Sequence, residues 1–334
     1  MKILIVSRNN SILKTHSDAL TAGHPHIVTD SHIAQIKNAG GAETVIVLAG
    51  DRNEAEPHVE DADIIAGFPA TIPDVSNALR LTWVHSFSAG VDRVLTPYVK
   101  ESDIILSNSS GIHATPIAEH LIGFMLIFTR GFYRTFQNQQ KHEWGKDETL
   151  GELRGKRVLI AGAGEIGMET ARLAAAFGAR VSAITRSRKE KPAFIEEMGV
   201  TADLDAMLSD ADFVVIALPH TDETHHFFDS SKFRVMKPTA VIMNIGRGGI
   251  INEQDLIAAL NEKRLFGAAL DVTEQEPLPA ESPLWDMENV IITPHHSGLS
   301  DQYMNRAIAL FTKNLYAFLA GKPLPTQVDK RLGY

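Results

Sequence analysis

The chain has 334 residues, of which 44% are hydrophobic and 22% charged, and its formal net charge is −9. The length predicts roughly two domains, and the composition excludes a disordered chain, a fibrous repeat and a disulfide scaffold. Because the sequence contains no cysteine, thiol catalysis and Cys-ligated metals are excluded as well. The negative charge does not favour nucleic-acid binding by the whole surface.

Short β-branched runs alternate with longer amphipathic or polar segments in the first third of the chain. This alternation predicts a parallel sheet with crossover helices, and the predicted strands are Lys2–Ser7, Thr44–Ala49, Asp63–Gly67, Leu81–Ser86 and Asp103–Asn108. The opening run is too short for a signal-peptide core, and the longest apolar stretch further on, Leu121–Phe128, is too short to span a membrane. We therefore expect a cytoplasmic protein without a membrane segment.

A helical pattern follows, because apolar residues from Pro116 to Arg130 recur at i, i+3, i+4 and i+7 with almost no polar face. The polar stretch Gln137–Gly155 is interpreted as an arm. A second alternating series then predicts strands at Arg157–Ala161, Arg180–Ile184, Asp212–Leu218, Ala240–Asn244, Gly267–Asp271 and Val290–Thr293. Helices are predicted between them, for example Glu165–Phe177 and Glu253–Glu262. No strand follows the last helix, Asp301–Leu319, so we expect it to pack on the first domain.

A glycine-rich turn joins the first strand of this second series to its helix. Gly162, Gly164 and Gly167 form a G-x-G-x-x-G motif. The first glycine permits the tight turn, the second lets a pyrophosphate approach the backbone, and the third lets helix and strand pack closely. The helix N-terminus offers free N–H groups to phosphates. The pattern predicts a dinucleotide site, and a purely structural glycine turn is the alternative.

The next strand ends in a basic segment, Thr185-Arg186-Ser187-Arg188-Lys189. NAD-binding proteins usually place Asp or Glu here to hold the ribose 2′-OH. No carboxylate precedes Glu190, and the cations could meet a 2′-phosphate, so NADP is favoured over NAD. A basic surface turn with relaxed cofactor choice is the alternative.

Three later strands end in segments that carry reactive side chains. Asn244–Gly249 holds Arg247 between glycines, Asp271–Pro277 carries three carboxylates, and Thr293–His296 carries two histidines. Ligands of open parallel sheets bind beyond the carboxyl ends of the strands, so these groups are expected to converge on one cleft.

With these motifs, the sequence resembles the D-isomer-specific 2-hydroxyacid dehydrogenases, and within them the glyoxylate/hydroxypyruvate reductases. The resemblance covers Ala89–Asp92, Asn108–His120, the glycine turn, the Gly-Arg-Gly loop, the Asp-Val…Glu-Pro segment and Thr-Pro-His. It implies an α/β protein with two doubly wound parallel-sheet domains. A Rossmann cofactor domain, residues 106–297, would be inserted into a flavodoxin-like substrate domain, residues 1–105 and 298–334.

The resemblance also assigns roles to residues. Arg247 looks like the substrate-binding arginine, Glu276 like the acid paired with the catalytic histidine, and His295 like the acid/base. Amides around Ala89 and Gly90 look like the seat of the substrate carboxylate. The candidate cofactor-binding residues are Gly162, Gly164, Glu165, Ile166, Gly167, Thr185, Arg186, Ser187, Leu218, Pro219, Thr224, Ile245, Arg247 and Asp271. The sequence departs from the family at Thr185, where Asp is usual, and at Thr273, where an aromatic residue is common.

Reduction of a 2-keto acid requires a hydride at the carbonyl carbon and a proton at its oxygen. A histidine such as His295 can supply that proton near neutral pH. Glu276 would fix its tautomer and stabilise the imidazolium, while the planar fork of Arg247 would bind the substrate carboxylate. Because neighbouring residues of an extended end point opposite ways, only one of His295 and His296 is expected to face the cleft, and the resemblance chooses His295. His296 is expected to be a polar residue behind or beside the site, and a direct role is the alternative. No metal is expected, and His225 and His226 are interpreted as surface residues.

The leading prediction is a reductase of small 2-keto acids, glyoxylate or hydroxypyruvate first, that prefers NADP and accepts NAD as the alternative. Two other classes stay open: a cofactor-sensing regulator of the corepressor type on the same fold, and a formate-oxidising relative. Neither nucleic acid nor membrane is an expected partner. We expect a homodimer with Trp144 at the subunit interface, and the alternative for Trp144 is a local hydrophobic anchor.

Overall fold

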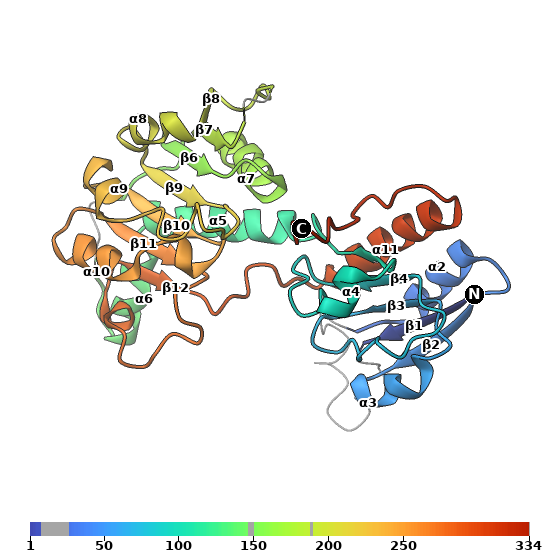
Figure 1. The fold of residues 1–334 in the computed structure, drawn as a ribbon. Helices are drawn as coiled ribbons and strands as arrows, with labels where there is room; N and C mark the ends of the chain where they lie inside the picture. Colours follow the sequence, from blue (N-terminus) through green and yellow to red (C-terminus); the bar gives the residue numbers. More distant parts are fainter. Residues whose placement is uncertain (8–26, 146–149, 188–189, 334) are drawn as a thin grey trace. The chain divides into compact units, whose positions relative to one another are not determined.

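The computed structural model describes residues 1–7, 27–145, 150–187 and 190–333 (Figure 1). The chain divides into two compact units, Met1–Ile112 with Leu299–Tyr334, and His113–Gly298. The sequence placed the junctions after residues 105 and 297, whereas the structure places them after Ile112 and Gly298. The first junction lies later because helix α5, Ala114–Thr129, begins just after it and packs into the core of the second unit.

The first unit contains a parallel sheet whose strand order is β2-β1-β3-β4-β5. The strands are β1 (Lys2–Val6), β2 (Val45–Ala49), β3 (Ile64–Gly67), β4 (Trp83–Ser86) and β5 (Ile105–Ser107). This is the doubly wound order of flavodoxin-like domains. All five strands predicted in this part of the sequence form, and they are one to three residues shorter than predicted.

Helices cover both faces of this first sheet. On one face α2 (Asp30–Gly40) packs with α11 (Tyr303–Leu319), whose Phe311 is buried against Trp83 of β4. The short helices α3 (Arg52–Ala55) and α4 (Pro97–Glu101) contribute to the core on the other face. The prediction that the last helix packs on the first domain is therefore confirmed, and α2 is one of the predicted crossover helices, although its bounds were not predicted.

The second unit contains a parallel sheet with the order β12-β11-β10-β9-β6-β7-β8. Its strands are β6 (Arg157–Ala161), β7 (Arg180–Thr185), β8 (Glu197–Val200), β9 (Phe213–Ile216), β10 (Val241–Asn244), β11 (Gly267–Leu270) and β12 (Val290–Ile292). The chain runs outward to β8, returns beside β6 and continues the other way. This reversal is the Rossmann arrangement, in which ligands bind beyond the carboxyl ends of the strands on either side of it, here β6 and β9.

Two hydrophobic clusters sandwich this second sheet. On one face α5 packs against α7 (Glu165–Ala176), and on the other lie α8 (Leu204–Leu208), α9 (Ser230–Val235) and α10 (Glu253–Asn261). Helix α6 (Phe132–Gln140) buries none of its residues and overlaps the stretch predicted as an arm. Beyond it Trp144 is 95% exposed, so the alternative of a local hydrophobic anchor is wrong. Among the residues described, no helix has the length and apolar content to cross a bilayer.

Candidate active site

The glycine turn after β6 is built from two glycines that no other residue can replace without displacement. Gly162 has φ +106°, and a Cβ there would lie 2.4 Å from the Ala217 carbonyl oxygen. A Cβ at Gly167 would lie 2.1 Å from the Gly162 carbonyl oxygen. At Gly164, by contrast, a Cβ would meet nothing within 4 Å. The turn is therefore closed beneath and leaves open space above Gly164, where a ligand can approach the backbone.

Helix α7 begins directly at this turn, with Gly164 as its N-cap and Glu165 as its first residue. No side chain caps the first turn in the described part of the chain, so its N–H groups stay available. Uncapped N–H groups and the positive end of the helix dipole attract an anion. Together with the space above Gly164, this arrangement fits the pyrophosphate of a dinucleotide.

Arg186 follows the end of β7 and is the cationic residue of this turn that the structure describes. The Thr185 hydroxyl is buried and donates to the Ser187 carbonyl at 2.6 Å, which closes the turn. The Arg186 side chain is 83% exposed and lies 3.7 Å from the equally exposed Glu223. Such an exposed pair holds its partners weakly, so Arg186 can turn to a 2′-phosphate. Arg188 and Lys189 fall outside the described residues.

The other candidate cofactor residues follow neighbouring strands of the same sheet. Leu218 and Pro219 follow β9 and Ile245 follows β10, and the register of β9 against both β6 and β10 brings these ends to one edge. Thr224 does not have a free hydroxyl, because it donates to the Pro219 carbonyl at 2.7 Å and accepts from the Thr221 N–H. The structure thus gives Thr224 a role in holding this loop together.

Arg247 lies on a loop whose backbone is held by the side chain of Asn244. The Asn244 side chain accepts from the Gly246 N–H and donates to the Arg247 carbonyl, each at 3.0 Å. Gly248 lies flat against the next loop, because a Cβ there would fall 1.8 Å from the Thr273 carbonyl oxygen. The exposed guanidinium donates only to the Gly246 carbonyl, and no described carboxylate pairs with it. Arg247 is therefore a charged group without an acid partner, beside the loop that carries the acids.

His295 and Glu276 lie within hydrogen-bond distance of each other, as the resemblance implies. Nδ1 of His295 lies 2.8 Å from Oε2 of Glu276, and Oε1 of Glu276 accepts from the Thr273 N–H at 3.3 Å. A carboxylate can only accept, so Nδ1 carries a proton, and Nε2 is the ring atom that faces away from the acid. The side chain of His295 is half exposed, which leaves Nε2 accessible to a ligand.

Asp271 organises the segment around His295. Its carboxylate is buried and accepts from the Thr293 hydroxyl, the His296 N–H, and both the N–H and the hydroxyl of Ser297. Burial acts to raise the pKa of Asp271, but the hydrogen bonds from Ser297 and Thr293 outweigh it and hold that pKa below the usual range. A carboxylate has about four acceptor positions, and these donors fill them. The side chain as it stands offers no acceptor to a cofactor.

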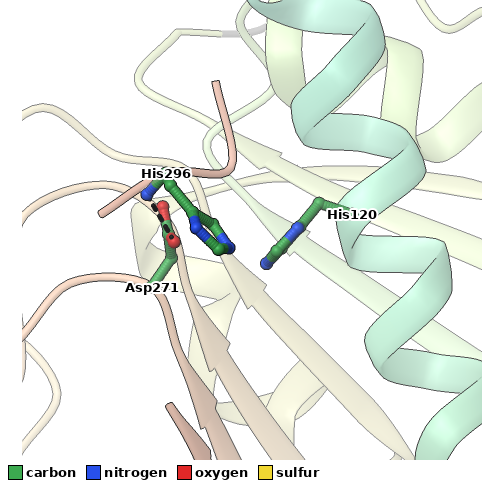
Figure 2. A group of neighbouring side chains, drawn as sticks. All are labelled: His120, Asp271 and His296. Carbon is green, nitrogen blue, oxygen red and sulfur yellow. Dashed lines mark hydrogen bonds between the residues drawn. The ribbon is translucent and has the colours of Figure 1, made fainter. Parts of the chain in front are cut away.

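The side chains of His120, His296 and Asp271 lie together (Figure 2), and one ligand atom from each of the three lies within 4.8 Å of the others. The filled carboxylate makes this group a poor cation cage, although its residue types suit a metal. His120 is half-buried, and burial chiefly lowers its pKa. The extended conformation expected at His295 and His296 is not found, because His295 has φ +49°, so alternation along a strand does not separate the two side chains.

Ala89 and Gly90 lie in the first unit, on the loop that follows β4. Asn108 donates to the Ala89 carbonyl at 2.7 Å, and the Ser86 hydroxyl donates to the Gly90 carbonyl at 3.3 Å. Within the described ranges, the N–H groups of Ala89 and Gly90 donate to no protein acceptor. Two amides without a partner on a held loop suit a carboxylate ligand.

Comparison with known proteins gives consistent matches over the whole chain. A family model described as "D-isomer specific 2-hydroxyacid dehydrogenase, NAD binding domain" matches residues 122–297. A glyoxylate reductase of Thermofilum pendens is 32% identical over 269 residues, which are 79% of this chain and 78% of the relative.

Two solved structures share the fold over nearly their full lengths. One is a D-isomer specific 2-hydroxyacid dehydrogenase family protein from Aeromonas salmonicida, with 32% identity, a TM-score of 0.82, and 98% and 99% of the two chains covered. The other is an NADPH-dependent glyoxylate/hydroxypyruvate reductase from Sinorhizobium meliloti, solved with NADP and sulfate. It shows 29% identity and a TM-score of 0.76, with 100% of this chain and 99% of that chain covered.

Proposed function

The chain belongs to the D-isomer specific 2-hydroxyacid dehydrogenase family of NAD(P)-dependent oxidoreductases, and on that premise we propose that it reduces small 2-keto acids to D-2-hydroxy acids. Glyoxylate and hydroxypyruvate are the proposed substrates. The observation that carries the proposal is the 2.8 Å pair of His295 and Glu276, one loop away from the unpaired Arg247. A proton donor and a carboxylate-binding cation are the two protein groups that this reduction requires.

The glycine turn and the N-terminus of α7 would hold the pyrophosphate of the cofactor, and Arg186 would meet the 2′-phosphate of NADP. The hydride would come from the nicotinamide when the cofactor is bound. NADP is proposed ahead of NAD because β7 ends in Thr185 and Arg186 rather than in a carboxylate. The NADP in the Sinorhizobium meliloti relative supports this choice.

In the proposed mechanism the chain binds the substrate and moves one proton. The guanidinium of Arg247 binds the planar carboxylate with two parallel N–H groups and draws electron density from the keto group. His295, protonated on both ring nitrogens, donates its Nε2 proton to the keto oxygen as hydride reaches the carbon. Glu276 accepts from Nδ1 and stabilises the imidazolium until His295 gives up its proton. The free amides of Ala89 and Gly90 in the first unit are proposed as a further carboxylate seat.

We also propose that the protein acts as a homodimer in which Trp144 is covered by the second subunit. An indole that is 95% exposed leaves a large apolar surface in water, and aromatic side chains of this kind are enriched at interfaces. The change Trp144→Ser should then weaken dimerisation, which sedimentation velocity measures over a dilution series. A wild-type chain that sediments as a monomer at all concentrations contradicts this part of the proposal.

A substrate panel tests the proposed activity. Glyoxylate, hydroxypyruvate, pyruvate and bulkier 2-keto acids are each offered with NADPH and with NADH, and formate is offered with NADP and NAD. The proposal expects the highest kcat/KM with glyoxylate or hydroxypyruvate and NADPH, and no oxidation of formate. Cofactor binding without turnover of any keto acid would instead support a cofactor-sensing regulator.

A further inference from the structure

The hydroxyl of Thr293 lies between Asp271 and His120, and only one assignment of hydrogen-bond donor and acceptor fits both contacts. Its Oγ1 atom is 2.6 Å from Oδ1 of Asp271 and 3.2 Å from Nε2 of His120. Asp271 has no proton to give, because its hydrogen bonds hold its pKa below the usual range. Thr293 must therefore donate its single proton to Asp271, and it can only accept from His120. This order of donors assigns the proton of the His120 ring to Nε2.

The hydrogen bonds from His120 through Thr293 to Asp271 lead to the segment 293–297, which contains His295. His295 has φ +49°, a left-handed conformation that non-glycine residues seldom adopt. Such a conformation persists only when neighbouring contacts over-determine it. Here the His295 N–H donates to the Asp271 carbonyl at 2.8 Å, while the Asp271 carboxylate holds Thr293, His296 and Ser297. One buried residue thus fixes the backbone on both sides of His295.

We propose that His120 is a positioning residue for His295 that acts through Thr293 and Asp271. Its Nε2–H occupies the acceptor side of the Thr293 hydroxyl and so directs the hydroxyl proton to Asp271. The directed bond keeps residues 293–297 in the conformation that sets His295 against Glu276. This inference rests on the proposed function, in which His295 transfers the proton.

Two other roles for His120 make different demands on its side chain. The ring packs edge-on against Phe124 with centroids 4.4 Å apart and against His296 at 5.6 Å, so a packing role needs the ring and not the N–H. A metal-binding role at this group of residues needs a free carboxylate, whereas hydrogen-bond donors already fill the acceptor positions of Asp271. The positioning role needs an N–H at the place of Nε2 and does not need the ring.

Two substitutions separate these demands. His120→Phe keeps an aromatic ring on Phe124 and removes the donor, whereas His120→Gln loses the ring and can place an amide N–H near the position of Nε2. We expect His120→Phe to lower kcat for keto-acid reduction about tenfold, with little change in KM for keto acid or NADPH, and His120→Gln to stay within about twofold of wild type. Thr293→Val should lower kcat as His120→Phe does, while Thr293→Ser should not.

Coupling between the two positions provides the second readout. If His120 acts through Thr293, the double variant His120→Phe/Thr293→Val should be no slower than Thr293→Val alone. Independent roles would multiply the two losses and contradict the proposal. A normal rate in His120→Phe, or a loss in His120→Gln as large as that in His120→Phe, contradicts it as well. If His120→Phe does not fold, His120→Leu is compared with His120→Gln by the same criteria.

His295→Ala, measured in parallel, separates failure of this inference from failure of the proposed function. An inactive His295→Ala with a normal His120→Phe removes only the positioning role. A His295→Ala variant that retains wild-type reduction overturns the proposed function itself. Long-range ¹H–¹⁵N spectra of the full chain add a direct check, because the neutral His120 ring is expected as the Nε2–H tautomer. The Nδ1–H tautomer would contradict the order of donors.

Discussion

Nδ1 of His295 lies 2.8 Å from Oε2 of Glu276, and the other oxygen of that carboxylate accepts the Thr273 N–H. The acid is therefore held by the backbone of its own loop while it orients the imidazole. This relationship directs Nε2 away from the acid and makes it the atom from which a proton can leave. The same loop lies against Gly248, so the acid and Arg247 are positioned by one contact between loops.

Removal of the charge at Glu276 should slow reduction without loss of cofactor binding. Glu276→Gln keeps the shape of the side chain but no longer stabilises the imidazolium, so kcat should fall about tenfold or more, and His295→Ala should cost about 10²–10⁴ in rate. Steady-state kinetics with NADPH and glyoxylate measure both changes. Glu274→Gln, at an exposed acid of the same segment that pairs with His226, is the matched control. Equal losses in the two Gln variants would contradict the pairing.

Arg247 should be sensitive to loss of its planar fork. Arg247→Lys keeps the charge but cannot form two parallel bonds to a carboxylate, so KM for the keto acid should rise and kcat should fall, each by about tenfold. The Kd of NADPH, measured by fluorescence, should change little. Arg264→Lys, at an exposed arginine of the same unit, should leave all three constants unchanged. Normal keto-acid kinetics in Arg247→Lys would remove this residue from the substrate site.

Cofactor choice should depend on Arg186. Arg186→Asp replaces a cation by an anion that repels a 2′-phosphate and can accept a ribose hydroxyl, so the ratio of kcat/KM for NADPH to that for NADH should invert. Glu223→Gln frees Arg186 from its weak partner and should not lower that ratio. The assay is initial rate against each cofactor at saturating keto acid. A wild-type preference for NADH of about tenfold or more would contradict the interpretation of this turn.

The buried His85 should make the first unit sensitive to acid. Its Nδ1 lies 2.7 Å from the Ser107 hydroxyl and its Nε2 lies 3.2 Å from the Ser109 hydroxyl, and burial lowers its pKa to about 3. An unfolded chain protonates a histidine near pH 6.5, so between about pH 6.5 and 3 the unfolded state binds the extra proton. Above this pH range His85 is neutral in both states and does not lower the free energy of unfolding. As pH falls through the range, the unfolded state gains the proton and the free energy of unfolding decreases.

Between pH 7 and pH 5 this effect lowers the free energy of unfolding by about 2 kcal/mol. Urea unfolding at the two pH values measures it, with fluorescence of the buried Trp83 as the probe for this unit. His85→Gln should reduce the difference between the two pH values, even if its stability at pH 7 is lower. His58→Gln, at a partly exposed histidine of the same unit, should not. An unchanged difference in His85→Gln would contradict the assignment.

The architecture could be predicted because buried parallel strands are nearly continuous apolar runs. The register of β1 against β3 and of β6 against β9 follows from such runs. Strand β8, Glu197–Val200, was missed because it lies at the edge of its sheet, is at most half-buried and contains both a glutamate and a glycine. The bounds of helix α2 could not be predicted because its mixed polar sequence gives little periodic signal.

The local motifs of the site could also be predicted, whereas its long-range contacts could not. Gly162, Arg247 and His295 stand in recognisable segments at strand ends. The bond from His120 to Thr293 joins residues 173 positions apart, and no spacing in the sequence indicates it. The left-handed conformation of His295 could not be predicted either, because no glycine marks it in the sequence. It is held by hydrogen bonds from His295 and His296 to Asp271, which is distant in the sequence.

The most direct test of the central claim is the initial rate of NADPH oxidation with glyoxylate by the wild-type chain and by His295→Ala, measured side by side on folded protein. We predict saturable turnover by the wild type and a rate about 10²–10⁴ lower in the variant. Equal rates in the two proteins, or no keto-acid-dependent oxidation of NADPH by the wild type, would contradict it.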